Sequence, residues 1–128
     1  MEPSSELDAL AHKVIGAAIE VHRILGPGYL ESVYEEALAI ELSIQGIGCD
    51  RQTPINIEYK GKAVGDGRLD LLVAGRLVVE LKTVDHLLPI HHAQVLSYLK
   101  ATRKRIGLLI NFNVRVLRDG IKRVVFSP

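Results

Sequence analysis

Cysteine is nearly absent from this sequence, in which Cys49 is the one cysteine among 128 residues. A single thiol excludes a disulfide within the chain. We expect Cys49 to be a small apolar residue of a strand; a catalytic thiol is the alternative, but no residue nearby in the sequence would activate it. A long N-terminal hydrophobic run is missing too, so nothing resembles a signal peptide or a membrane span. These absences predict a reducing, cytoplasmic location.

Aromatic residues and net charge are also scarce, at 5% of the chain and +1. The small net charge hides an asymmetry, because residues 1–99 carry −6 whereas residues 100–128 contain eight Lys or Arg and one acid. This basic segment could contact a phosphate backbone, or it could be ordinary solvated surface. The scarcity of aromatic residues gives little support for base stacking there. The basic residues concerned are Arg103, Lys104, Arg105, Arg115, Arg118, Lys122 and Arg123.

An apolar content of 48% is enough for one compact domain over residues 1–128. The periodicity predicts an α/β fold with the element order ααβββαββ, in which helices flank a mixed sheet. A right-handed crossover through the third helix would return the next strand parallel. The predicted helices span residues 4–25, 30–45 and 89–102, the strands 49–59, 62–73, 76–83 and 105–111, and a hairpin counted as one element spans 114–126 around Asp119-Gly120.

Two apolar, β-prone runs around a glycine-containing turn predict the hairpin that carries the most informative residues, Asp70 and Glu80. A two-residue loop would place these acids on opposite faces of the ribbon. A three-residue loop at 74–76 pairs Val73 with Leu77 instead and brings the two acids directly across from each other, with Cβ atoms about 4.5–5.5 Å apart. We predict the three-residue loop or an equivalent bulge.

Two neighbouring carboxylates in a half-buried site repel each other unless a cation lies between them. Oxygen ligands favour Mg²⁺ or Mn²⁺, and Mg²⁺ needs only one or two carboxylates. Leu81 could add its backbone carbonyl, and Lys82 could assist the attacking water or neutralise charge on a phosphate. The pattern therefore predicts metal-assisted phosphodiester hydrolysis. The alternative, a solvated strand face, is disfavoured by the apolar run Val78-Val79 before Glu80.

The second predicted helix opens with Gly28-x-x-Glu31-x-x-Tyr34, and Glu35 follows Glu31 on the same helical face. A third metal-site acid could come from this face. Alternatively, its acids complement the positive end of the helix dipole and face solvent.

The third predicted helix carries Gln94 and Tyr98 four positions apart, so their side chains could together orient a phosphate, a water or Lys82. The adjacent His91 and His92 would point about 100° apart and could not both bind one ion, which argues against zinc. We expect a surface or packing role for them.

Asp70, Glu80-x-Lys82, an acid on an early helix and Gln94-x-x-x-Tyr98 together resemble the PD-(D/E)xK nuclease superfamily. Residues 28–34 look like the signature of its GxxExxY branch. The resemblance extends from about residue 14 to residue 126, although Leu69 stands where the motif has proline. It implies a restriction-endonuclease-like αβββαβ core in which Asp70 and Glu80 bind Mg²⁺ and Lys82 assists catalysis. It also implies that Glu31 completes the acidic cluster and that Gln94 and Tyr98 line the site.

The sequence thus favours a Mg²⁺- or Mn²⁺-dependent DNA nuclease whose metal ligands are Glu31, Asp70, Glu80 and Leu81. Two alternatives stay open, a non-catalytic nucleic-acid-binding module that relies on the basic segment and a protein-interaction subunit or homodimer with a nuclease fold.

Overall fold

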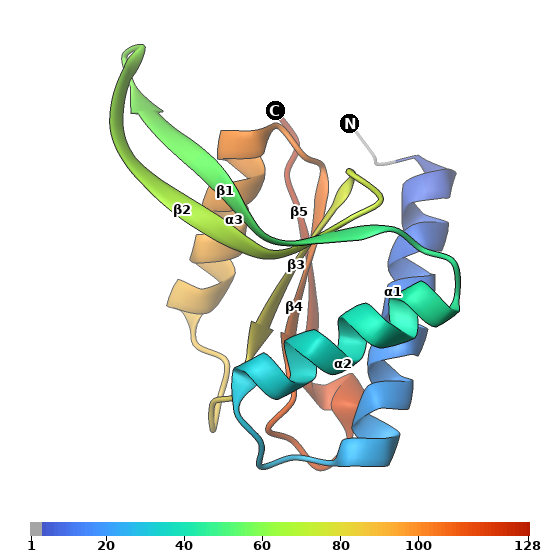
Figure 1. The fold of residues 1–128 in the computed structure, drawn as a ribbon. Helices are drawn as coiled ribbons and strands as arrows, with labels where there is room; N and C mark the ends of the chain where they lie inside the picture. The colour runs from blue at the N-terminus through green and yellow to red at the C-terminus, as the bar shows by residue number, and fades with distance from the viewer. Residues whose placement is uncertain (1–3) are drawn as a thin grey trace.

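Five strands form one mixed sheet, with two helices against one face and a third helix against the other (Figure 1). The computed structural model describes residues 4–128, so residues 1–3 of the predicted domain lie outside it. The predicted α/β class and element order are confirmed. The elements are α1 (Ser5–Leu25), α2 (Glu31–Ile44), β1 (Cys49–Tyr59), β2 (Lys62–Val73), β3 (Leu77–Lys82), α3 (Pro89–Thr102), β4 (Ile106–Asn111), a 3₁₀ helix η1 (Leu117–Gly120) and β5 (Ile121–Val125).

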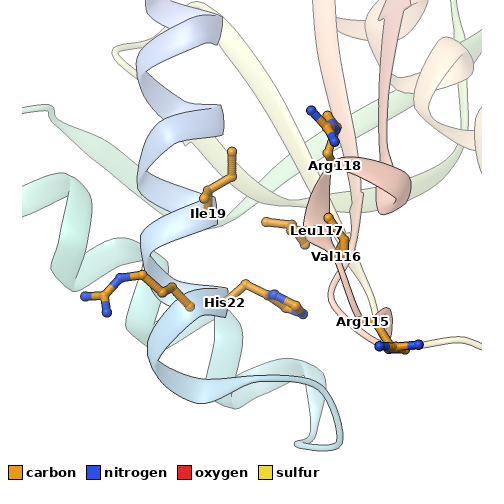
Figure 2. Close-up of a pocket in the computed structure, with 7 residues that line it drawn as sticks. Ile19, His22, Arg115, Val116, Leu117 and Arg118 are labelled. Atoms are coloured by element: carbon orange, nitrogen blue, oxygen red, sulfur yellow. The ribbon is translucent and has the colours of Figure 1, made fainter.

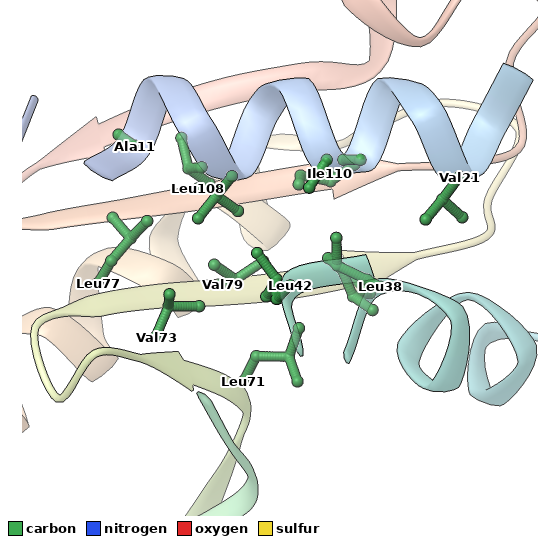
Figure 3. Close-up of a cluster of buried hydrophobic side chains, with 14 of the residues drawn as sticks. Ala11, Val21, Leu38, Leu42, Leu71, Val73, Leu77, Val79, Leu108 and Ile110 are labelled. Carbon is green, nitrogen blue, oxygen red and sulfur yellow. The ribbon is translucent and has the colours of Figure 1, made fainter. Parts of the chain in front are cut away.

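The main core lies between the sheet and helices α1 and α2 (Figure 3). Its sheet residues come from alternate positions of β2, β3 and β4, because successive side chains of a strand point to opposite faces. The remaining face carries a smaller cluster under α3, to which Val95 and Leu99 contribute. The labelled residues of the main core are Ala11, Val21, Leu38, Leu42, Leu71, Val73, Leu77, Val79, Leu108 and Ile110.

The ends of α1 and α3 follow the expected local signals. The Ser4 hydroxyl caps α1 by accepting a hydrogen bond from the Leu7 N–H at 3.2 Å. The helix stops at Gly26, whose φ of +69° suits glycine. Pro89 occupies the first turn of α3, and the Nδ1 atom of His91 accepts from the Leu88 N–H, which gives this histidine the structural role expected of it.

The predicted parallel crossover is present, since β3 and β4 pair in parallel from Val78–Gly107 to Lys82–Asn111. The connecting helix α3 packs so closely that a Cβ on Gly107 would lie 2.8 Å from a methyl group of Val95. This packing fixes α3 over the sheet beside the end of β3.

The predicted hairpin over residues 114–126 is wrong. Asn111 ends β4, its side chain accepts from the Asn113 N–H, and η1 follows before the single strand β5 pairs with β4. The 3₁₀ turn buries Leu117 to 3% exposure, and Gly120 approaches the Asn111 carbonyl more closely than any side chain would allow. Packing against the end of β4 therefore overrides the local hairpin signal at Asp119-Gly120.

Within residues 4–128, no helix combines the length and apolar character that crossing a membrane requires.

Candidate active site

The register between β2 and β3 is the one given by a three-residue loop. Val73 pairs with Leu77, and the ladder continues to Leu71–Val79. Ala74 and Gly75 in the loop both have positive φ, and the Arg76 N–H closes it on the Val73 carbonyl at 3.0 Å. The predicted loop is confirmed, and Asp70 and Glu80 are the next residues along the two strands.

Beyond the last ladder pair, the two strands are connected by hydrogen bonds from backbone N–H groups to the carboxylates of Asp70 and Glu80. The Asp70 N–H donates to Oε2 of Glu80 at 2.7 Å, and the Leu81 N–H donates to Oδ2 of Asp70 at 2.8 Å. Each carboxylate is thus held by the backbone of the opposite strand. The structure brings Asp70 and Glu80 together where the strands separate.

Burial and mutual repulsion disfavour the charged forms of both acids. Glu80 is only 4% exposed, and burial followed by the charge of Asp70 raises its pKa to about 8. Burial also raises the pKa of Asp70, against the lowering effect of the Leu81 N–H. A cation bound between Asp70 and Glu80 would therefore be stabilised by both charges.

Leu81 and Lys82 lie at the same edge. In a strand, the N–H and C=O of one residue point to the same side, so the carbonyl of Leu81 points toward Asp70, as its N–H does. The Lys82 carbonyl points the other way and accepts from the Phe112 N–H. The positive charge of Lys82 lowers the pKa of both Asp70 and Glu80, which places the ammonium in their electrostatic range.

Glu31 reaches the same region from the first turn of α2. Burial and then the charge of Asp70 raise its pKa, while the charge of Lys82 lowers it. The preceding loop is held by Tyr34, whose hydroxyl donates to the Gly26 carbonyl at 2.6 Å and accepts from the Tyr29 N–H at 3.2 Å. Gly28 has a φ of +110°, which a side chain rarely tolerates. The motif residues Gly28 and Tyr34 therefore position Glu31.

Replacing Tyr34 by phenylalanine should lower the free energy of unfolding by about 1 kcal/mol, because the loop loses two hydrogen bonds. The ring itself would stay, stacked on Phe112 with centroids 4.5 Å apart. Urea denaturation would measure the change. Tyr59→Phe, at a residue that is 62% exposed on the β1–β2 hairpin, is the matched control and should leave the unfolding curve unchanged. Equal curves for both variants would contradict this role of Tyr34.

Gln94 and Tyr98 of α3 form a joined pair beside the acids. The Gln94 amide donates to the Tyr98 hydroxyl at 3.2 Å. Burial, and next the charge of Glu80, raise the pKa of Tyr98, so its ring lies near the two carboxylates. The phenol therefore stays protonated and can donate a hydrogen bond at the site.

The sequence analysis missed Gln52 and Arg51 of β1. The Gln52 amide donates to Oε1 of Glu35 at 2.6 Å, and its proximity lowers the pKa of Asp70. Arg51 pairs with Oε2 of Glu35 at 3.0 Å and also with Glu36. Glu35 is only 9% exposed, so the expectation that this acid faces solvent is wrong.

The donor set fits a hard divalent cation. Among residues 4–128, no three His, Cys, Asp or Glu side chains are arranged to hold a metal ion, so the described cluster amounts to the pair Asp70 and Glu80. Mg²⁺ accepts such a set, since water and substrate oxygens complete its octahedron. Within the described part of the chain, no hydrogen-bond donor reaches Oε1 of Glu80, which leaves this oxygen available.

A family model of the PD-(D/E)XK nuclease superfamily matches residues 8–124 of the chain. The chain belongs to this superfamily. Membership indicates a nuclease-type function and is consistent with the restriction-endonuclease-like fold.

Among solved structures, the chain is similar to one described as the crystal structure of SSO0001, with a TM-score of 0.53 and 23% sequence identity. The match covers 76% of this chain and 50% of that one, so this chain spans about half the length of SSO0001. At this identity the likeness shows the fold alone. No curated protein matches the chain.

Several basic residues of the C-terminal segment of this PD-(D/E)XK protein contact other parts of the chain. Arg115 and Arg118 line a pocket of about 360 Å³ between α1 and η1, which contains none of the predicted site residues (Figure 2). Arg123 pairs with Asp8, and Lys104 donates to the Gly75 carbonyl.

Proposed function

We propose that this protein is a metal-dependent nuclease that hydrolyses phosphodiester bonds of DNA. Asp70 and Glu80 would hold Mg²⁺ or Mn²⁺ together with the Leu81 carbonyl, and Glu31, within electrostatic range of Asp70, would add negative charge beside this pair. The observation that carries the proposal is the reciprocal hydrogen bonding that keeps the buried Glu80 and half-buried Asp70 carboxylates together within the electrostatic range of Lys82.

The divalent cation would supply Lewis-acid stabilisation of the charge that develops on the phosphate. Lys82 would orient the attacking water and neutralise negative charge as the P–O bond breaks. Tyr98, held by Gln94, would donate a hydrogen bond to a phosphate oxygen or to that water. Burial and Asp70 raise the pKa of Glu31, whereas a bound cation would lower it; in its ionised form Glu31 would accept a proton from the attacking water.

The positioning of Glu31 by Gly28 and Tyr34 supports placing the chain in the GxxExxY branch of the superfamily. A reducing, cytoplasmic location agrees with the single cysteine. A partner protein or a second copy of the chain is part of the proposal as a source of substrate specificity.

The test is cleavage of linear, nicked and single-stranded DNA and of RNA, with Mg²⁺ or Mn²⁺ and with EDTA. Wild type should give products only with the metal, and Asp70→Ala should give none. Asp66→Ala, on the same strand but exposed, is the matched control and should cleave like wild type. Salt-sensitive binding of nucleic acid without cleavage, equal in wild type and Glu80→Gln, would favour the non-catalytic module instead.

A further inference from the structure

Gln52 has a backbone conformation that its place in the fold does not explain. Four non-glycine residues among 4–128 have positive φ. Lys60, Ala74 and Arg103 lie in two hairpin loops and at a helix end, where such values are common. Gln52, with a φ of +50°, lies within a strand. Left-handed backbone costs a residue with a side chain about 1 kcal/mol or more, and it persists where surrounding contacts impose it.

The side chain of Gln52 lies between Glu35 and Asp70, while its backbone carbonyl accepts from Nη1 of Arg68 at 3.3 Å. On either side of it the ladder pairs Arg51 with Leu71 and Thr53 with Leu69, which places Gln52 across from Asp70. Its Nε2 atom donates to Oε1 of Glu35 at 2.6 Å, and its side chain is close enough to Asp70 to lower the pKa of that carboxyl. An amide N–H only donates and a carboxylate only accepts, so the amide is suited to lie between these two acids.

Glu35 is a fixed anchor for this amide. Its other oxygen is bound by the guanidinium of Arg51, and the side chain is 11% exposed. Because α2 carries Glu35 and β2 carries Asp70, the Gln52 amide joins a helix to the strand that holds the proposed metal ligand.

We propose that Gln52 is a positioning residue, which fixes the Asp70 carboxylate in the orientation that binds the divalent cation. The amide lies between Asp70 and Glu35, two acids whose charges repel each other. This inference rests on the proposed metal-dependent nuclease function.

Gln52→Gly separates this role from a merely structural one. Glycine accepts a positive φ without strain, which offsets part of the stability lost with the amide hydrogen bond to Glu35, so the variant should stay folded and unfold within a few degrees of wild type. It lacks the amide, so its dissociation constant for Mn²⁺ should rise about 10–100-fold, as for other residues that orient metal ligands. The value of kcat at fixed Mg²⁺ should fall, KM for DNA should change little, and raised Mg²⁺ should restore part of kcat. Gln52→Met, of similar length but without donors or charge, should bind Mn²⁺ as weakly as Gln52→Gly.

The experiment is calorimetric titration of Mn²⁺ into the metal-free full chain, with thermal unfolding and cleavage kinetics of the same samples. Gln45→Ala is the control, because Gln45 contacts only Glu41 at the end of α2 among the described side chains and should bind Mn²⁺ like wild type. A Gln52→Gly variant with the Mn²⁺ affinity and kcat of wild type overturns this inference alone. A wild type that neither binds Mn²⁺ nor cleaves overturns the proposed function and this inference with it.

Discussion

Glu80→Gln is expected to stabilise the metal-free protein above neutral pH and to reduce its metal-dependent cleavage by a factor on the order of 10³ or more. The substitution raises stability but lowers activity, because both depend on the charge of the Glu80 carboxylate. Glu80 is a buried acid whose charge the fold disfavours and whose charge the proposed chemistry requires. Few substitutions in this chain should combine a gain in stability with so large a loss of activity.

The pH window follows from the raised pKa of Glu80. In the unfolded chain this acid loses its proton near pH 4.3–4.5, whereas in the fold its pKa is about 8. Between these values the folded state binds a proton that the unfolded state has released, so stability falls as pH rises through the window. Glutamine resembles the protonated form, and the variant should keep a few kcal/mol that wild type has lost at pH 8.

Thermal unfolding of both proteins in EDTA at pH 5 and pH 8 would measure this effect. The two should unfold at closer temperatures at pH 5, and the variant should unfold several degrees higher at pH 8. Mg²⁺ should raise the unfolding temperature of wild type at pH 8 and leave the variant unchanged. Glu58→Gln, at an exposed position of β1, should behave like wild type. An unfolding temperature of Glu80→Gln below that of wild type at pH 8 would contradict the cost assigned to the buried charge.

The sequence predicts the register of the β2–β3 hairpin well because its loop is short. Only two loop lengths compete there, and only one of them keeps the acids on one side. The β1–β2 hairpin is different, because a register shift between Ile57 and Glu58 displaces by one residue every pair that lies farther from the turn. A regular hairpin around Lys60-Gly61 would place Arg51 across from Asp70, but the bulge places Gln52 there. Sequence patterns do not reveal such a bulge.

The helix acids illustrate a second limit. Glu31 and Glu35 are four residues apart and share one face, which the sequence shows. Their different surroundings depend on β1, which brings Arg51 and Gln52 to Glu35 and leaves Glu31 near Asp70 and Lys82. Contacts between elements distant in the chain decide which acid is bound by the protein and which one stays available for chemistry.

Lys82→Ala should lower kcat for cleavage by a factor of about 10²–10⁴, the range typical of a residue that assists proton transfer or neutralises charge in the transition state. The metal ligands would all remain, so Mn²⁺ binding should survive. It should weaken near pH 7, because the charge of Lys82 lowers the pKa of Asp70 and Glu80 and its loss lets both rise. As the pH rises further and a larger fraction of both acids is ionised, Mn²⁺ affinity should recover while kcat should not.

Lys82→Arg distinguishes the charge of this residue from its chemistry. The guanidinium keeps the positive charge and therefore Mn²⁺ affinity at pH 7, but it holds its proton too firmly to exchange it and has a different shape. Loss of cleavage in both variants, with Mn²⁺ affinity kept only in arginine at pH 7, would place Lys82 in the chemical step. Lys62→Ala, at an exposed residue of β2, should match wild type in both measurements. If Lys82→Ala cleaves at the wild-type rate, the lysine only compensates the charge of two buried acids, and the water must be activated by another group.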